Sequence, residues 1–310
     1  MDTLEVNIDY GRQLKNNYFI QEYMLTVIEE PRYVLPNRVY GKGTGFEQHE
    51  FFEAPSIRKK GEYYYLIYSS VVMHELCYSV SKNPLEGFTY GGVIISNCDI
   101  GISNGKPKEK PMAYGANNHG GIVNIRDQWY IFYHRHTNHS WYCRQGCAEP
   151  ITFQGEHIRQ VEMTSCGLNG KPLKGKGTYP SYIACNLFTE KEEMYVGGEN
   201  QPYIMRDGCD GDYDPAYITN LTDHATAGFK YFSCKDVKKI GISVRGYARG
   251  EFEVRTAWDG SVCGKISVDF TNVWEYYEAP VKIDNGIQAI YLTFRGEGTA
   301  DLQSVTFTTL

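Results

Sequence analysis

The sequence has no long apolar run and no excess of positive charge. No stretch approaches the ~20 consecutive apolar residues that a membrane-spanning helix needs, which argues against a helical membrane protein. The formal net charge is -6, so no basic patch for nucleic acid or an anionic membrane surface is expected. The chain also lacks a phosphate-binding glycine loop, a G-x-S-x-G elbow and an H-E-x-x-H motif, which argues against the enzyme classes that use them.

The nine cysteines form no compact framework. Only Cys143 and Cys147 lie close together, and no second ligand pair follows them, so no structural zinc site is predicted there. Because the count is odd and the spacing irregular, reduced thiols in a cytosolic protein are expected. The first 15 residues hold no apolar signal-peptide core, so we predict no signal peptide and a cytoplasmic location.

Tyrosine and glycine, by contrast, are abundant, with 26 and 32 copies. Aromatic residues favour strands and glycines favour the tight turns between them, so this composition indicates an all-β protein. Tyrosine also suits carbohydrate binding, because its ring packs on the apolar face of a sugar while its hydroxyl stays in water.

A weak internal repeat indicates the kind of β-structure. The segment EAPSIRKKGEYYYLIYSS resembles NHGGIVNIRDQWYIFYHR, and an offset of 65 residues pairs Tyr64 with Trp129 and Glu53 with Asn118. Each copy reads as a strand, a tight turn, an aromatic strand and a further strand, which is the pattern of a β-propeller blade. A closed propeller has about 4–8 blades, whereas residues 1–165 hold two clear ones.

The rest of the chain is predicted to form a connector and a second domain. Residues 166–224 are rich in loop signals and are expected to pack on the propeller as a connector. Residues 225–310 alternate between polar and apolar positions, with turns about every 8–12 residues, which predicts a jelly-roll-like β-sandwich. Trp258 and Trp274 in this domain either belong to its core or form platforms on which a sugar ring stacks.

Glu53 is the first candidate for chemistry, since it stands at the start of the tyrosine-rich pair of strands. Aromatic surroundings can keep a carboxyl group protonated near neutral pH, as a general acid for glycosidic bond cleavage requires. The alternative is an ordinary solvated carboxylate at the end of a strand.

Three further residues stand where they could bind a ligand. His119 is followed by two glycines, which let its backbone approach another group, and its imidazole could ligate a metal, bond a sugar hydroxyl or simply be buried in a turn. His134 ends the aromatic strand WYIFY, and Arg144 follows Trp141 and Tyr142. An arginine among aromatic residues can bind sugar hydroxyls or form a structural salt bridge.

The segments FFEAPSIRKKGEYYYLIYSS, AYGANNHGGIVNIRDQWYIFYHRHTN and RQGCAEPI together resemble glycoside hydrolase family 43, a group of five-bladed propellers. Members of that family act mainly as β-xylosidases, α-L-arabinofuranosidases and arabinanases. The segments GFKYF, VRGYARGEFEVRTAWDG and FTNVW resemble the carbohydrate-binding module of family 6. The resemblance implies an all-β chain with a partial five-bladed propeller (residues 1–165) followed by a β-sandwich (residues 225–310).

The resemblance also implies roles for individual residues. Glu53 matches the general acid of the family. His119 matches a histidine near the propeller axis that lies beside or ligates calcium, so calcium is the expected cofactor. Arg144 matches an arginine that contacts the sugar, and Asn118 and His134 are expected to bind substrate beside it.

One departure from the family pattern bears on activity. The family places a base Asp and a second, tuning Asp before the acid, whereas only 52 residues precede Glu53, and Asp2 and Asp9 stand in no matching context. The sequence therefore predicts that the first propeller blades are missing and that an N-terminal propeller fragment is a partner. A general base contributes about 10²–10⁴-fold to the rate, so the missing base puts that much activity at risk.

Two functions follow from these observations. The first is inverting hydrolysis of terminal arabinofuranosyl or xylosyl residues from plant-type oligosaccharides, with Glu53 as the acid. The alternative is a catalytically incomplete carbohydrate-binding fragment, or one half of a split enzyme.

Overall fold

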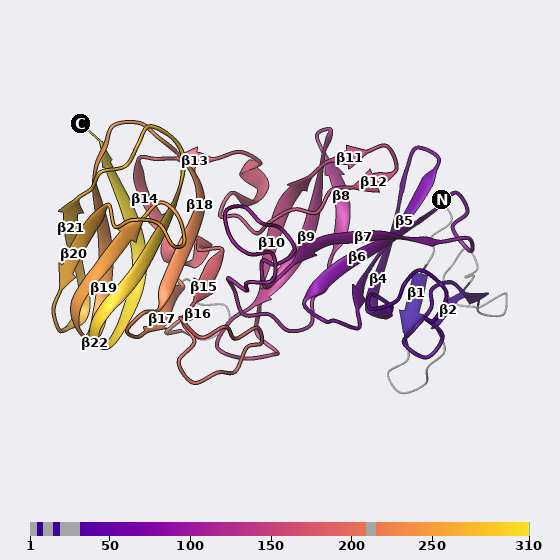
Figure 1. Cartoon of the computed structure of the whole chain (residues 1–310), viewed down its shortest axis with the longest axis horizontal. Helices are drawn as coiled ribbons and strands as arrows, with labels where there is room; N and C mark the ends of the chain where they lie inside the picture. Colours follow the sequence, from indigo (N-terminus) through magenta and orange to yellow (C-terminus); the bar gives the residue numbers. More distant parts are fainter. Residues whose placement is uncertain (1–4, 9–14, 19–31, 209–214, 310) are drawn as a thin grey trace. The chain divides into compact units, whose positions relative to one another are not determined.

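The computed structural model describes residues 5–8, 15–18, 32–208 and 215–309 of the chain. These residues form β-strands with only two short 3₁₀ helices, which confirms the all-β prediction (Figure 1). Two compact units can be distinguished. The first holds residues 1–97, 117–134 and 146–161, and the second holds residues 98–116, 135–145 and 162–310. Among the described residues, no helix has the length and apolar character needed to cross a membrane.

The first unit contains the two predicted propeller blades. One is a four-stranded antiparallel sheet in the order β4-β5-β6-β7, and the other is a three-stranded sheet in the order β10-β9-β8. A small sheet, β1-β2-β3, and a hairpin, β11-β12, accompany them. The strand bounds are β1 Glu5–Ile8, β2 Lys15–Tyr18, β3 Arg32–Tyr33, β4 Phe51–Lys60, β5 Tyr63–Ser70, β6 Glu75–Ser81, β7 Thr89–Ser96, β8 Gly121–Ile125, β9 Gln128–His136, β10 Arg144–Ile151, β11 Phe153–Gln154 and β12 His157–Ile158.

The offset of 65 residues recovers equivalent strands in the two blades. Tyr64 lies in β5 and Trp129 lies in β9, and each strand follows a two-residue turn. In the second blade this turn is formed by Arg126 and Asp127, both with positive φ (50° and 66°), which matches the right-handed twist of the strands it joins. The repeat predicted from the sequence is therefore confirmed in the fold.

Aromatic and aliphatic side chains of β5 alternate between the two faces of the first blade. Tyr68 is fully buried and packs on Phe51 with ring centroids 5.7 Å apart. Tyr65 faces the opposite side, where it meets Phe153 edge-on at 5.3 Å. Both faces of the sheet are therefore covered by other side chains. The burial of apolar surface on each face stabilises the blade, because the hydrophobic effect is the dominant favourable contribution to folding.

The second unit is a β-sandwich built around two long strands, β19 and β22, which pair with each other along most of their length. Glycines occur where these strands approach closely. Gly298, at φ 80°, leaves no room for a Cβ atom beside the carbonyl of Tyr247. Gly250 and Gly296 face each other in the same ladder, each against the other's backbone. A side chain at these positions would separate the two strands.

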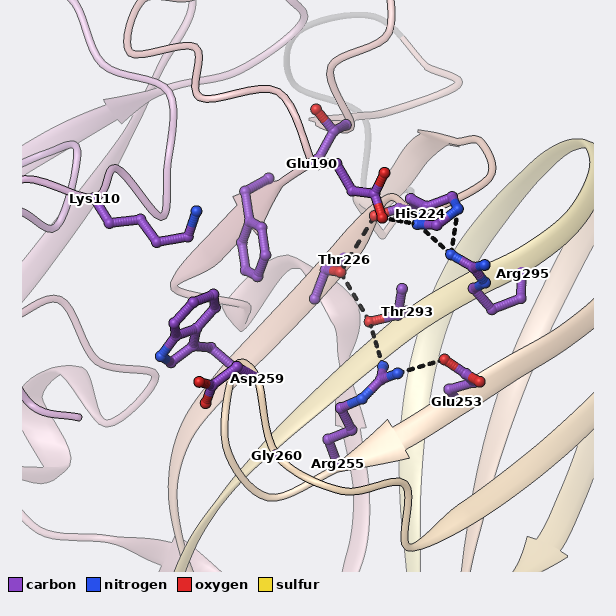
Figure 2. Close-up of a pocket in the computed structure, with 13 residues that line it drawn as sticks. Lys110, Glu190, His224, Thr226, Glu253, Arg255, Asp259, Gly260, Thr293 and Arg295 are labelled. Atoms are coloured by element: carbon purple, nitrogen blue, oxygen red, sulfur yellow. Dashed lines mark hydrogen bonds and ion pairs between the residues drawn. The ribbon is translucent and has the colours of Figure 1, made fainter. Parts of the chain in front are cut away.

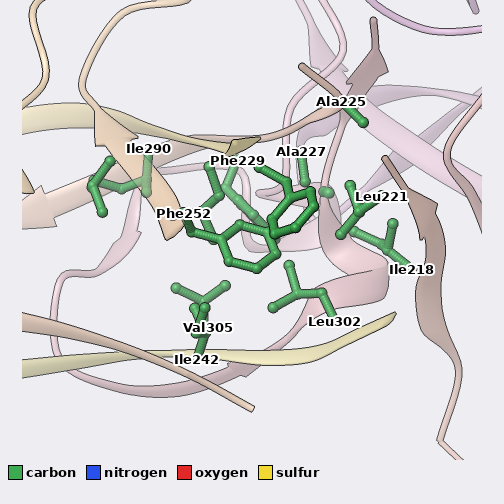
Figure 3. Close-up of a cluster of buried hydrophobic side chains, with 14 of the residues drawn as sticks. Ile218, Leu221, Ala225, Ala227, Phe229, Ile242, Phe252, Ile290, Leu302 and Val305 are labelled. Atoms are coloured by element: carbon green, nitrogen blue, oxygen red, sulfur yellow. The ribbon is translucent and has the colours of Figure 1, made fainter. Parts of the chain in front are cut away.

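Aliphatic side chains and phenylalanine rings pack together in the core of the sandwich (Figure 3). Phe252 of β19 packs on Phe294 of β22 with centroids 5.2 Å apart, and Phe232 of β18 packs on Phe307 at 4.4 Å. All four are nearly inaccessible to solvent. The predicted β-sandwich is thereby confirmed.

Residues 166–224, expected as a connector, contribute strands to the sandwich sheet. The segment β14 pairs with β22, β15 pairs with β18, and β16 and β17 extend the sheet beyond β22. These strands have two to five residues each, too short to show a periodic pattern in the sequence. The bounds are η1 Gly167–Asn169, β13 Leu173–Lys174, β14 Gly177–Pro180, η2 Ser181–Ile183, β15 Asn186–Phe188, β16 Tyr203–Met205, β17 Tyr217–Leu221, β18 Thr226–Cys234, β19 Val237–Arg255, β20 Gly264–Val268, β21 Thr271–Pro280 and β22 Gly286–Thr309.

Eight of the nine cysteines lie in the described residues, and all eight are free thiols. This agrees with the expectation of reduced cysteines. Cys209 lies outside the described residues. The cytoplasmic location stays a prediction.

Candidate functional site

Glu53 lies near the start of β4, where the strand departs from regular pairing with β5. It pairs with Ser69, the register shifts on both sides of it, and the next residue, Ala54, has φ 56°. Irregularities of this kind change the direction of a side chain relative to simple strand alternation. Glu53 is only 5% exposed, so it is not a solvated carboxylate at the end of a strand.

His119 lies against Glu53 although the two are 66 residues apart. The His119 Nε2 atom is 2.9 Å from the Glu53 Oε1 atom, a hydrogen-bonding distance. At Gly120, a Cβ atom would collide with the backbone carbonyl of Phe132, so only glycine lets this loop pass so close to β9. The glycines therefore place the His119 side chain beside the carboxyl group.

His134 extends this pair into a cluster of three. Its ring is 5.7 Å from the His119 ring in an edge-on arrangement, and the residue is 8% exposed. Asn118, the neighbour of His119, is completely buried. The structure thus brings Glu53, Asn118, His119 and His134 into the first unit, as the repeat and the family resemblance predict for a shared site.

Two buried amide oxygens lie beside this cluster. The Asn118 Nδ2 atom and the Asn97 backbone N–H both donate to the carbonyl oxygen of His74, at 3.4 and 2.8 Å. The Oδ1 atoms of Asn97 and Asn118 have no hydrogen-bond partner among the described residues. Amide oxygens are among the oxygen ligands that calcium uses, whereas the His119 imidazole, for which the sequence predicts a metal, is engaged with Glu53.

Arg144 is the remaining residue for which the sequence predicts a role in the site. Arg144 begins β10, is exposed, and belongs to the second compact unit. Its role in sugar binding stays a prediction. Asp2 and Asp9, for which the sequence shows no blade context, lie outside the described residues.

A second candidate site lies in the sandwich unit, which holds a pocket of about 560 Å³ (Figure 2). Its wall is the outward face of β18, β19 and β22, opposite the aromatic core. Trp258, in the loop after β19, contributes an indole ring, and Lys110 lies over that ring at 5.1 Å. The lining residues are Lys110, Phe188, Thr189, Glu190, His224, Thr226, Glu253, Arg255, Trp258, Asp259, Gly260, Thr293 and Arg295.

Polar side chains on the wall of the pocket are linked in a chain. Thr226 bonds to Thr293 at 2.9 Å, and Arg255 donates to Thr293 at 3.1 Å and to Glu253 at 2.5 Å (Figure 2). Burial alone would raise the pKa of Glu253, but the hydrogen bond and charge of Arg255 leave that pKa below its ordinary value. The wall is therefore a fixed array of donors and acceptors beside an aromatic ring, which suits a polyhydroxylated ligand.

No pattern in the sequence predicts this pocket. The alternation of Glu253 and Arg255 with buried Val254 marks a polar face of β19, but nothing local shows that the face is hollowed. Of the two tryptophans that the sequence offers as sugar platforms, Trp258 is half-buried and lines the pocket. Trp274 is also half-buried, and its ring face is covered by the Arg245 guanidinium at 4.4 Å.

Arg245 is held in that position from several sides. Asp207 accepts two hydrogen bonds from it at 2.8 and 2.9 Å, and Asp301 accepts one at 3.1 Å. The guanidinium carbon of Arg245 also lies 4.7 Å from the centre of the Tyr217 ring. The hydrogen bonds from Arg245 lower the pKa of Asp207. Trp258 therefore lines the pocket, whereas the Arg245 guanidinium lies fixed over the Trp274 ring.

The chain is similar to curated glycosidases. A xylosidase/arabinosidase from Thermoclostridium stercorarium is 58% identical over 293 residues, which are 92% of this chain and 62% of the relative. An arabinoxylan arabinofuranohydrolase from Paenibacillus polymyxa is 24% identical over 286 residues, which are 85% of this chain and 42% of the relative. The chain thus spans about three fifths or less of the length of these relatives. No family model matches it.

Solved structures of the same two kinds are similar to parts of the chain. One is a glycoside hydrolase family 43 arabinoxylan arabinofuranohydrolase from Bacillus subtilis. The match includes 96% of this chain and 59% of that protein, at 16% identity and a TM-score of 0.44. Another is a family 6 carbohydrate-binding module from Clostridium cellulolyticum in complex with xylose. The match includes 44% of this chain and 98% of that module, at 16% identity and a TM-score of 0.34.

The 58% identity and the blade motifs around Glu53 decide the relationship. The chain is homologous to part of the Thermoclostridium stercorarium xylosidase/arabinosidase, and the match extends over 92% of this chain.

Proposed function

We propose that the first unit supplies the general acid of an inverting glycosidase that removes terminal arabinofuranosyl or xylosyl residues from plant-type oligosaccharides. The observation that carries the proposal is the buried Glu53 carboxyl group, 5% exposed and 2.9 Å from His119. The Thermoclostridium stercorarium relative is named for action on both kinds of sugar, which supports this choice of substrates.

Glu53 would begin the reaction protonated. It gives its proton to the glycosidic oxygen as the bond to the anomeric carbon breaks, so the alcohol leaves neutral and Glu53 becomes a carboxylate. His119 holds the carboxyl group in place through the contact at Oε1. In an inverting enzyme a second carboxylate, roughly 6.5–9.5 Å from the acid, activates the attacking water.

We expect the base to come from a propeller segment that this chain does not contain. The test is to mix the chain with the portion of the Thermoclostridium stercorarium relative that it does not span and to assay aryl arabinofuranoside and aryl xyloside. Turnover that requires both polypeptides would support the proposal. Equal turnover by the chain alone would show that the base lies within it, and a stable but inactive mixture would contradict the assigned activity.

The sandwich is proposed to hold the oligosaccharide through the pocket beside Trp258. An indole ring stacks on the apolar face of a sugar, and the array of Thr226, Thr293 and Arg255 offers hydrogen bonds to hydroxyl groups. Replacing Trp258 with alanine is expected to weaken binding of xylo-oligosaccharides at least about 10-fold, the effect of losing one stacking contact in a binding site. Titration calorimetry measures this directly.

Tyr276 provides a matched control, because it is an aromatic residue of the same unit that is 52% exposed and lies outside the pocket. Tyr276→Ala is expected to bind the sugars as the unmodified chain does. Equal affinity of Trp258→Ala and the unmodified chain would rule out the pocket as the sugar site.

Calcium is proposed to bind through the amide oxygens of Asn97 and Asn118, with His119 beside it. The ion would supply positive charge that satisfies these buried acceptors. Adding calcium is therefore expected to raise the melting temperature of the chain, with a gain that grows with ligand concentration. Replacing Asn118 with leucine should remove this gain, as followed by calorimetry with calcium or with a chelator present.

Asn124 offers a control for that measurement, since it lies in β8 of the same unit and is exposed. Asn124→Leu is expected to keep the calcium effect. A melting temperature of the unmodified chain that does not respond to calcium would overturn the proposal.

A further inference from the structure

Three potential metal ligands converge in the first blade, apart from Glu53 and His119. They are His49 in the loop before β4, and Glu75 and Cys77 of β6. One ligand atom from each residue lies within 4.8 Å of the others. Glu75 and Cys77 are two positions apart, so their side chains point to the same face of the strand. Neither the sequence motifs nor the proposed hydrolysis accounts for this group.

The convergence is centred on one carboxylate oxygen. The Glu75 Oε1 atom is 2.6 Å from His49 Nδ1, 2.6 Å from the Ser70 hydroxyl and 3.4 Å from Cys77 Sγ. The imidazole is held in this orientation by stacking on the Tyr90 ring, with centroids 5.1 Å apart and planes 9° apart. The ligand atoms are therefore positioned by the fold before any ion binds.

We propose that His49, Glu75 and Cys77 form a binding site for a zinc ion. Imidazole nitrogen, carboxylate oxygen and thiolate sulfur are the three ligand types that zinc uses in proteins. Tetrahedral bonds of about 2.0–2.3 Å place ligand atoms about 3.3–3.8 Å apart. The Glu75–Cys77 separation of 3.4 Å already fits this range. The His49–Glu75 separation of 2.6 Å must open by less than about 1 Å.

Charge balance favours the same ion. Glu75 is 5% exposed and Cys77 is completely buried, so an uncompensated charge in this place would be costly. A divalent ion bound by one carboxylate and one thiolate has no net charge. Binding displaces the proton of the Cys77 thiol and the proton shared by His49 and Glu75, and both are released to solvent.

An opening to solvent exists on one side. The His49 side chain is 31% exposed, whereas that of Glu75 is 6% exposed. An ion can therefore reach the site past His49, and water can occupy the fourth position on that side. Such a site would fix the loop before β4 to β6, close to where β4 begins.

Cobalt is the probe for this site, because it replaces zinc and a cobalt–thiolate bond gives a charge-transfer band in the near ultraviolet. The full chain, freed of metal with a chelator, is titrated with cobalt and then with zinc. We expect one equivalent to produce the band and zinc to abolish it. Cys77→Ser should eliminate the band. Cys98→Ser, which replaces another fully buried free thiol, should retain it.

His49→Ala gives an independent measure, because a partly exposed loop residue can be replaced without loss of the fold. It should weaken zinc binding by at least about 100-fold. Replacing a residue that does not bind the metal itself, but hydrogen-bonds to a metal ligand, typically weakens binding by about 10–100-fold. If Cys77→Ser does not fold, the His49→Ala result decides. Absence of the band in the unmodified chain, its persistence in Cys77→Ser, or unchanged zinc affinity in His49→Ala would overturn the proposal.

Discussion

Replacing Glu53 with glutamine is expected to lower hydrolysis of aryl arabinofuranosides and aryl xylosides by about 10²–10⁴-fold, the usual contribution of a general acid. Glutamine keeps the shape of the side chain and can still bond to His119, but it has no proton of suitable acidity to give to the leaving oxygen. The measurement is kcat/KM for the chain mixed with the complementary portion of the Thermoclostridium stercorarium relative.

The leaving group provides an internal check on this result. A dinitrophenol leaves without protonation, so the loss caused by Glu53→Gln should shrink for dinitrophenyl glycosides. Glu62→Gln is the control, because Glu62 is 66% exposed and forms only a surface pair with Lys82. A loss that is equal for all leaving groups would mean that Glu53 is structural, and no loss would remove it from the site.

Replacing Lys230 with methionine is expected to reduce the free energy of unfolding by about 3–5 kcal/mol, the cost of leaving one partner of a buried ion pair alone. The Lys230 Nζ atom lies 2.7 Å from Asp99 Oδ2 and 2.9 Å from Glu162 Oε2. The side chains of Lys230 and Asp99 are 5% and 2% exposed, so water cannot replace the lost partner. Urea unfolding followed by circular dichroism measures the change.

Two further variants separate the buried charge from other effects. Lys265→Met removes a lysine that is 52% exposed and paired with Glu251, and it should leave the free energy of unfolding nearly unchanged. The double variant Lys230→Met with Asp99→Asn should recover part of the loss, because the more deeply buried of the two carboxylates is then uncharged and only Glu162, whose side chain is 19% exposed, has lost its partner. If Lys230→Met is as stable as Lys265→Met, the buried pair does not contribute as described.

The blade pattern could be read from the sequence because it depends on local features. Strand alternation and two-residue turns act within a few residues of each other, and the offset of 65 residues between Tyr64 and Trp129 repeats the same local pattern. The same offset set Glu53 opposite Asn118, and in the structure the neighbour of Asn118, His119, contacts Glu53. The repeat in the sequence therefore predicted that Glu53 and the segment around His119 lie close together.

The pocket beside Trp258 and the group around His49 have no pattern in the local sequence that predicts them. The pocket beside Trp258 needs strands from three distant segments, and Arg245 covers the Trp274 ring only because Asp207 and Asp301 hold it there. The convergence of His49 on Glu75 spans 26 residues and two strand connections. Single residues of these kinds are common in any sequence, so composition and spacing could not single them out.

By itself, the sequence determined that this protein is all-β, that it contains two blade-like repeats followed by a sandwich, and that Glu53 stands on the first of these blades. The tertiary structure alone decided that Glu53 is buried against His119, that the segment before residue 225 belongs to the sandwich, and that the pocket and the His49 group exist. The physical reason is that alternation and turns act between near neighbours, whereas burial and side-chain convergence arise only when distant strands pair.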